Sequence, residues 1–183
     1  RHTLATDKVM TSKVRSIKDS YHGILFQKIN TIDRNFLTLS RNDKECLFKR
    51  TELVMDFSTS IAVERELANE GRTFRRCTSF LNPKGDDVVL LIEDKDRISR
   101  LDLLEMDYYR NLIVDERFAH HLVQTETVRT NTFSCRSESM ILNYENVRVL
   151  SAIISKQIRK YYTLGQAFLS IWHFDTENGT VSS

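Results

Sequence analysis

The sequence predicts an α/β fold, in which a parallel, doubly wound open sheet is flanked by helices. Short apolar runs bounded by polar residues have the length of strands, and helix-like segments alternate with the first of them. The stretch Leu53–Glu93 reads as strand, polar turn, helix and strand, and it places Asp56 at a strand's carboxyl end. Open α/β sheets bind ligands at such ends, so we expect a functional site there.

Local signals give the elements in order. Thr6–Asp7 is an N-cap, Gly23 and Gly165 end helices, and apolar residues at 147, 150, 154 and 158 share one helix face. We expect a helix up to Tyr21, a strand Ile24–Ile29, a helix Arg41–Phe48, a strand Leu53–Asp56, a helix Ile61–Asn69, strands Cys77–Leu81 and Val88–Ile92, helices Leu101–Ile113 and Glu116–Val123, a loop at about 124–136, a helix Tyr144–Tyr162 and a strand Phe168–Phe174.

Composition is that of a folded protein. The 183 residues suit one domain, and 40% apolar with 28% charged residues is ordinary for a globular chain. A net charge of +2 without a basic block gives no support to nucleic-acid binding, and no apolar run is long enough to span a membrane.

Cysteine and histidine usage argues against stabilising cross-links. Cys46, Cys77 and Cys135 are widely separated, which favours a reducing compartment, and we expect the cytoplasm. There is no paired-cysteine motif, and the adjacent His120 and His121 would point to different faces of a helix. We therefore expect no protein-bound zinc.

Several residues are candidates for chemistry, each with an ordinary structural alternative. Asp56 could bind a ligand, although on position alone a turn or cap role is favoured. Ser58, Thr59 and Ser60 could bind the same ligand or cap the Ile61 helix. Taken singly, Arg1 and Lys13 are ordinary surface charges, and Glu105, Asp107 and Arg110 are expected on the solvated face of their helix.

Cys135 is the candidate nucleophile. It follows a polar loop, and the neighbouring Arg136 would favour the thiolate. Cys46 and Cys77, by contrast, are expected to be small buried residues.

Taken together, these features resemble the later part of the ThiF/MoeB/HesA family of ubiquitin-activating-type adenylyltransferases. The segment Arg1–Leu4 resembles the family's Asn-x-x-Arg-Gln turn, Thr11–Val14 its Gly-x-x-Lys helix start, and Leu53–Ser60 its strand with an Asp-Ala-Thr-Asp-Asn-like turn. Phe80–Gly85 and Leu101–Tyr109 resemble a bacterial branch found with ubiquitin-conjugating-like or JAB-like domains, often in antiphage operons.

The resemblance implies a Rossmann-like fold and a mechanism. An enzyme of this kind binds ATP and Mg²⁺, adenylates the C-terminus of a ubiquitin-like protein and works as a homodimer. Arg1 and Lys13 would neutralise phosphate charge, Asp56, Ser58 and Thr59 would lie at the nucleotide, and Asp56 would hold the metal. Cys135, assisted by Arg136, would then accept the acyl group as a thioester.

Two departures from the family define the rival interpretation. The glycine-rich nucleotide loop and the ribose-binding acid would lie upstream of Arg1, so we expect residues 1–183 to form a partial adenylation domain that is inactive alone. Thr59 also stands where the family has its metal-binding aspartate. The alternative is therefore a non-catalytic ThiF-like module that binds or scaffolds a partner protein.

Overall fold

The computed structural model describes residues 34–58, 60–70, 74–122 and 143–183, together with residues 16, 18, 19, 30 and 32. The chain divides into two compact units, Arg1–Lys49 and Arg50–Ser183. The first unit contains η1 (Phe36–Thr38) and α2 (Arg41–Phe48). The second contains β1 (Leu53–Asp56), α3 (Ile61–Asn69), β2 (Arg75–Leu81), β3 (Asp87–Ile92), α4 (Leu101–Val114), η2 (Glu116–Phe118), α5 (Tyr144–Leu164), β4 (Phe168–Asp175) and β5 (Thr180–Ser182).

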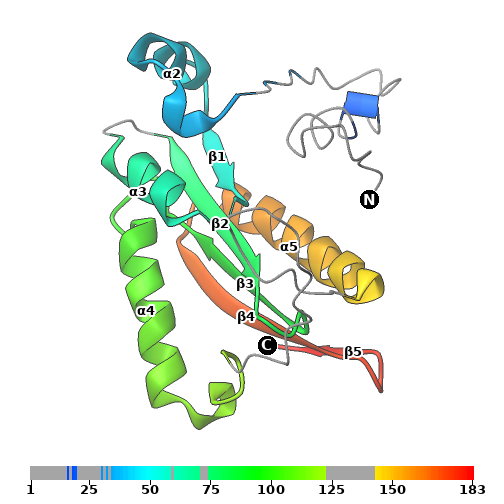
Figure 1. The fold of residues 1–183 in the computed structure, drawn as a ribbon. Coiled ribbons are helices and arrows are strands. Elements are labelled where there is room, and N and C mark those ends of the chain that lie inside the picture. The colour runs from blue at the N-terminus through cyan, green and yellow to red at the C-terminus, as the bar shows by residue number, and fades with distance from the viewer. Residues whose placement is uncertain are drawn as a thin grey trace. The chain divides into compact units, whose positions relative to one another are not determined.

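The second unit is built on an open sheet with strand order β1-β2-β3-β4-β5 (Figure 1). Among the described strands, β1 and β2 pair in parallel, and the three remaining pairs are antiparallel. The expectation of an α/β fold with an open sheet and flanking helices is confirmed. The expectation of a parallel, doubly wound sheet is wrong, because the sheet is mixed.

The reversal after β2 has a local cause. The Asn82 side-chain oxygen accepts hydrogen bonds from the N–H groups of Gly85, Asp86 and Asp87 at 2.9–3.1 Å. Gly85 adopts a left-handed φ of 74°, which glycine tolerates without steric cost. A connection this short can join only antiparallel neighbours, since a parallel pair needs a crossover of a dozen residues or more.

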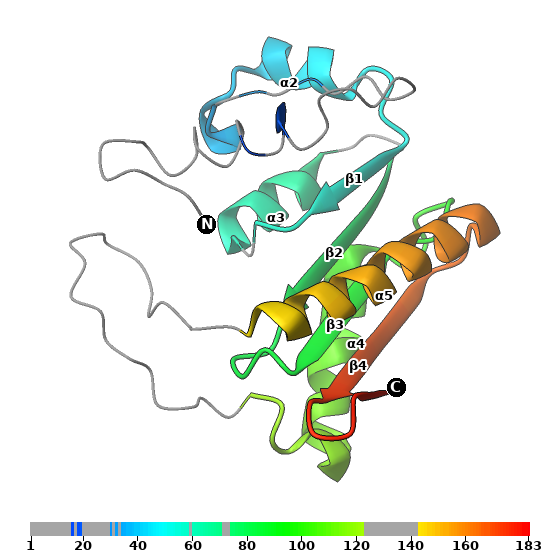
Figure 2. The same ribbon diagram turned by 90° about the vertical axis from the view of Figure 1, so that its right-hand side faces the viewer.

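Helices cover both faces of the sheet, with α4 and α5 on opposite sides (Figure 2). Two buried clusters follow from the alternation of side chains along the strands. Leu90, Ile92 and Trp172 pack with Leu150 and Ile154 of α5. On the other face, the adjacent strand positions 89, 91 and 171 pack with positions 101, 104 and 108 of α4. The predicted core face of Tyr144–Tyr162 and the predicted alternation of Phe168–Phe174 are therefore confirmed.

The carboxyl end of α5 is fixed by a glycine and an arginine. Gly165 has a φ of 70°, and its N–H donates to the carbonyls of Tyr161 and Tyr162, as predicted for a helix end. The buried Arg75 guanidinium donates to the same two carbonyls and to those of Glu93 and Gln166. This one side chain therefore ties β2 to the end of α5.

The start of α4 is fixed by Glu93, which is fully buried directly after β3. Its carboxylate accepts the N–H groups of Leu101 and Arg76 and pairs with Arg97 at 3.0 Å. A negative charge at the first turn of a helix is favourable. Glu93 thereby determines where α4 begins relative to the sheet.

The structure confirms the predicted α2, β1 and α3 and extends most other elements by one or two residues. Two further expectations are wrong. Cys46 is exposed rather than buried, and the predicted 116–123 helix is replaced over its described residues by the 3₁₀ helix Glu116–Phe118 and a turn at 119–122. The short β5 was not predicted. The expected strand Ile24–Ile29 and loop 124–136 lie outside the described residues. Among the described helices, none has the length and apolarity needed to cross a membrane.

Candidate functional site

Of the candidate residues at the predicted site, the structure describes Asp56 and Ser58. Arg1, Lys13 and Thr59 of the expected nucleotide site lie outside the described residues, as do Cys135 and Arg136. The described part of the predicted site is therefore the carboxyl end of β1.

Asp56 is buried at the end of β1, where its exposed fraction is 9%. Its Oδ1 accepts the Ser58 N–H at 2.9 Å, which is the hydrogen bond of a turn aspartate. Its carbonyl accepts the hydroxyl of Thr78, the residue opposite it on β2, at 2.9 Å. Ser60 is the N-cap residue of α3 but makes no capping hydrogen bond through its side chain to the described residues. The turn hydrogen bond occupies one carboxylate oxygen of Asp56, so the other oxygen can still bind a ligand.

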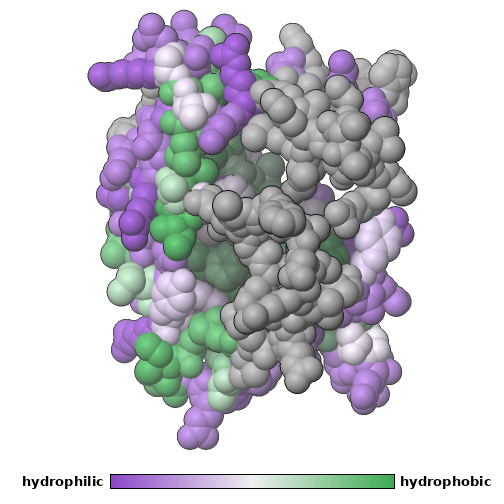
Figure 3. Space-filling view, viewed as in Figure 1, coloured by the Kyte–Doolittle hydropathy of each residue, from purple (hydrophilic) through white to green (hydrophobic). Residues whose placement is uncertain are grey.

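Asp56 lines a pocket of about 420 Å³ between α3, α4 and the strands β1 and β2. That volume lies within the usual range for small-molecule sites. Its apolar wall includes Ile61, Leu103 and Met106, which are more than half exposed. Figure 3 shows hydrophobic patches among hydrophilic ones over this side of the molecule.

Two carboxyl groups meet in this pocket, one from each helix. Burial, followed by the negative charge of Glu105 and a hydrogen bond to it, raises the pKa of Glu64 from 4.5 to about 7. Glu105 also accepts a hydrogen bond from Tyr109, whose pKa is raised by burial and by Glu105. A carboxyl group that titrates near neutral pH can take up or release a proton under physiological conditions. Glu105 therefore lines a pocket, contrary to its expected place on the solvated face, whereas Asp107 and Arg110 are exposed as predicted.

Arg76 brings a positive charge to the pocket wall. It is 1% exposed, and one guanidinium nitrogen donates to the Glu70 carbonyl at 2.6 Å. Its Nε has no hydrogen-bond partner among the described residues. A buried donor without a partner costs free energy, which makes Nε a candidate donor to a ligand oxygen.

A second polar cluster lies on the α4 face of the sheet, at the start of β3. Asp87 is 2% exposed and receives His121 Nδ1 on Oδ2 and His173 Nδ1 on Oδ1, both at 2.6 Å. His121 Nε2 lies 3.0 Å from the Tyr108 hydroxyl. Burial opposes the charge of Asp87, but the hydrogen bonds from the two histidines outweigh it and hold its pKa below the ordinary value.

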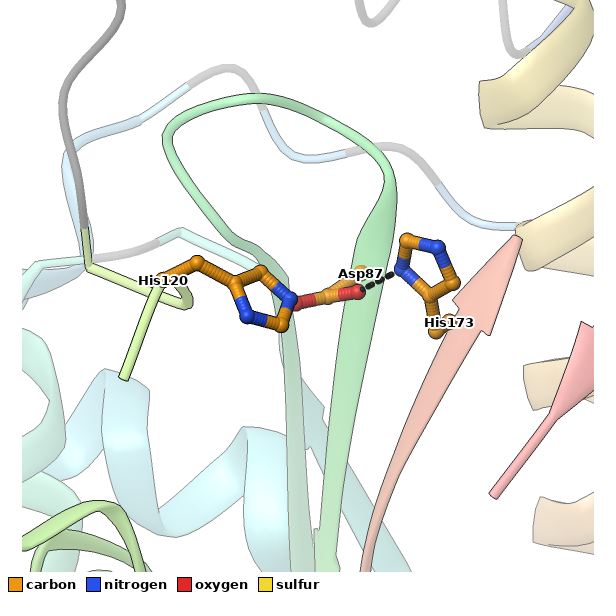
Figure 4. Close-up of side chains that lie close together, drawn as sticks. All are labelled: Asp87, His120 and His173. Carbon is orange, nitrogen blue, oxygen red and sulfur yellow. Dashed lines mark hydrogen bonds and ion pairs between the residues drawn. The ribbon is translucent and has the colours of Figure 1, made fainter. Parts of the chain in front are cut away.

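His120 completes this cluster, because it faces Asp87 and His173 from the turn after η2 (Figure 4). As expected, His120 and His121 point differently: His121 is buried and His120 is exposed. Both nevertheless lie beside Asp87. The chain spacing of 87, 120 and 173 follows no metal-binding motif, so the sequence contained no signal for this group.

No protein-family model matches the chain, and no curated protein matches it. The functional assignment therefore depends on the chain's own residues.

Proposed function

We propose that the chain is part of a ubiquitin-activating-type adenylyltransferase with a Rossmann-like nucleotide site at the carboxyl end of β1. The observation that carries the proposal is the position of Asp56. It ends the first strand of the parallel β1–α3–β2 unit and lines a pocket of small-molecule size. Ligands of open α/β sheets bind at this edge.

The pocket has donors and acceptors that suit a nucleotide bound with Mg²⁺. The Arg76 Nε–H offers a hydrogen bond to a phosphate or ribose oxygen, since the described residues leave it unsatisfied. The carboxylates of Asp56, Glu64 and Glu105 are oxygen ligands of the kind that Mg²⁺ prefers. When bound, Mg²⁺ would offset the repulsion between these acids and the phosphates.

The remaining steps follow the family resemblance. Arg1 and Lys13 would bind the phosphates while the C-terminal carboxylate of a ubiquitin-like protein attacks the α-phosphorus and pyrophosphate leaves. The Cys135 thiolate would then attack the acyl carbon, forming a thioester as AMP leaves, with Arg136 favouring the ionised thiol.

The rival proposal is a non-catalytic module that uses the same sheet to hold a partner protein. Thr59, in place of the family's metal-binding aspartate, favours it. The two proposals differ in one measurable property, which is a covalent adduct on Cys135.

Two measurements test the proposal. The first is calorimetric titration of the full-length protein with ATP and Mg²⁺. Asp56→Asn should weaken binding about tenfold or more, because a charge-assisted contact is lost. Asp107→Asn, which removes the charge of an exposed aspartate outside the lining of this pocket, is the matched control and should bind as the parent does.

The second measurement is intact-protein mass spectrometry after incubation with ATP, Mg²⁺ and a ubiquitin-like protein. The sample is the full-length protein. A thiol-sensitive adduct should form, persist in Cys46→Ala and vanish in Cys135→Ala. ATP binding without any adduct would support the rival module, and unaltered ATP binding in Asp56→Asn would remove the nucleotide site altogether.

A further inference from the structure

We propose that Asp87, His120 and His173 form a binding site for a divalent transition metal of the zinc type. The three side chains come from the start of β3, the turn after η2 and the end of β4, and they point toward one another (Figure 4). One ligand atom from each residue lies within 4.8 Å of the other two. The site is separate from the pocket at Asp56, because none of its three residues lines that pocket.

The geometry is close to that of a coordination sphere. Bonds of about 2.0–2.2 Å to nitrogen and oxygen place tetrahedral ligands about 3.4 Å apart. His173 Nδ1 and Asp87 Oδ1 are 2.6 Å apart with a shared proton, so a metal ion replacing that proton would spread them by less than about 1 Å. His120 is exposed, and its ring lies edge-to-face to the His173 ring with 6.2 Å between the ring centroids. A rotation of the His120 side chain can therefore bring its imidazole nitrogen to the metal.

The carboxylate is held in place from behind. Asp87 Oδ2 accepts His121 Nδ1 at 2.6 Å and the Asn82 amide at 3.2 Å. With Nδ1 protonated, His121 uses Nε2 to accept the Tyr108 hydroxyl, and burial raises the pKa of that hydroxyl so that it stays protonated. Outer hydrogen bonds of this kind orient ligating carboxylates and increase metal affinity.

These contacts leave Asp87 Oδ1 directed at His173. Strand pairing fixes the His173 position, since it lies directly opposite Asp87 on β4. The side chain of His173 is 42% exposed, against 3% for Asp87. A metal at this place would therefore have a buried carboxylate on one side and solvent on the other.

The donor set selects the kind of metal. Two imidazoles and one carboxylate suit Zn²⁺ and its neighbours in the transition series, whereas Mg²⁺ and Ca²⁺ prefer oxygen alone. Three protein ligands leave at least one position for water, which is the arrangement of reactive rather than purely structural zinc sites. The sequence-based expectation of no zinc rested on the spacing of cysteines and histidines, and this cluster is formed by the fold instead.

The test is titration of the chelator-treated chain with Zn²⁺, measured by calorimetry, and with Co²⁺, measured by visible absorption. We expect one high-affinity site per chain. His120→Ala and His173→Ala should each lower the affinity about 100-fold or more, because loss of a ligand costs at least as much as loss of an outer-shell partner. Leu122→Ala, an exposed substitution in the same turn as His120, is the matched control and should bind as the parent does.

Thermal unfolding without metal provides the folding control, since His120 is exposed and its removal should leave the apoprotein's stability unchanged within about 0.5 kcal/mol. Asp87 itself is kept, because its removal would also break the buried bonds to His121 and Asn82. Absence of stoichiometric binding would overturn the proposal. So would binding that survives in both histidine variants, because the metal would then be held by other residues.

Discussion

Glu64→Gln should change how the stability of the protein depends on pH. In the folded chain, burial and the Glu105 charge raise the pKa of Glu64 from 4.5 to about 7. Glutamine has nearly the same shape, and its amide can donate to Glu105 as the protonated acid does. The substitution therefore removes the ionisation of Glu64 while keeping its hydrogen bond.

The sign of the effect follows from proton linkage. The folded state binds the Glu64 proton more tightly than the unfolded state, so its contribution to stability is complete below about pH 4.5 and is lost as pH rises through about 7. Without solvent screening, this shift of the Glu64 pKa corresponds to about 3.4 kcal/mol of stability. Glu64 is only partly buried, and solvent screening reduces the effect to about 1–2 kcal/mol.

The assay is urea denaturation of parent and variant from about pH 5 to about pH 8.5. The free energy of unfolding of Glu64→Gln, relative to the parent, should rise by about 1–2 kcal/mol across that range. Glu66→Gln, which removes a carboxylate from the same helix outside the pocket lining, is the control and should show a smaller change. A difference in unfolding free energy between Glu64→Gln and the parent that stays constant with pH would refute the raised pKa of Glu64 in the folded chain.

Two further substitutions and one labelling experiment test the fold. Arg75→Met should lower the free energy of unfolding by about 3 kcal/mol or more, measured by urea denaturation, because it removes a donor from four carbonyls, of which only those of Tyr161 and Tyr162 keep the Gly165 N–H. Burial raises the pKa of the Cys77 thiol to about 12, so a thiol reagent should label the exposed Cys46 in the native protein and Cys77 only after unfolding, as followed by peptide mass spectrometry. Gly165→Ala should cost about 1 kcal/mol in the same denaturation assay, because alanine resists a φ of 70° and its Cβ would lie 3.4 Å from Lys95; an unchanged midpoint would contradict that geometry.

Local signals predicted most of the described elements but not the pairing of the strands. Ser40 and Gly165 mark helix ends through hydrogen bonds to residues three or four positions away, and such ends are readable in the sequence. Alternation of helix and strand predicts a parallel sheet, but the connection between β2 and β3 is too short for a parallel crossover. The short Asn82–Asp86 connection already implied an antiparallel turn.

The polar clusters could be predicted only in small part. The position of Asp56 at a strand end could be predicted, because a strand end is a local feature. Glu64 meets Glu105, and Asp87 meets His173, only after the sheet and α4 have assembled, so their altered environments have no counterpart in residue spacing. Burial, rather than residue type, distinguishes Glu105 from the equally charged but exposed Asp107 on the same helix.

Arg75 and Arg76 differ in how fully the described residues satisfy their guanidinium groups. Both are buried, and they point to opposite faces of β2. Arg75 uses its guanidinium fully on backbone carbonyls, whereas Arg76 leaves Nε without a partner among the described residues. Burial, followed by the positive charge of Arg97, lowers the pKa of Arg76 to about 10. Keeping Arg76 charged in the folded chain therefore costs free energy.

Arg76→Met should therefore change the stability of the ligand-free chain by no more than about 1 kcal/mol, because it removes a poorly compensated buried charge along with one hydrogen bond. The same substitution should weaken the binding of ATP with Mg²⁺ at least as much as Asp56→Asn does. Urea denaturation and calorimetric titration on one preparation measure the two effects. A loss of stability equal to that of Arg75→Met, with ATP affinity unchanged, would place Arg76 in the structural class and leave the pocket without its anion-binding group.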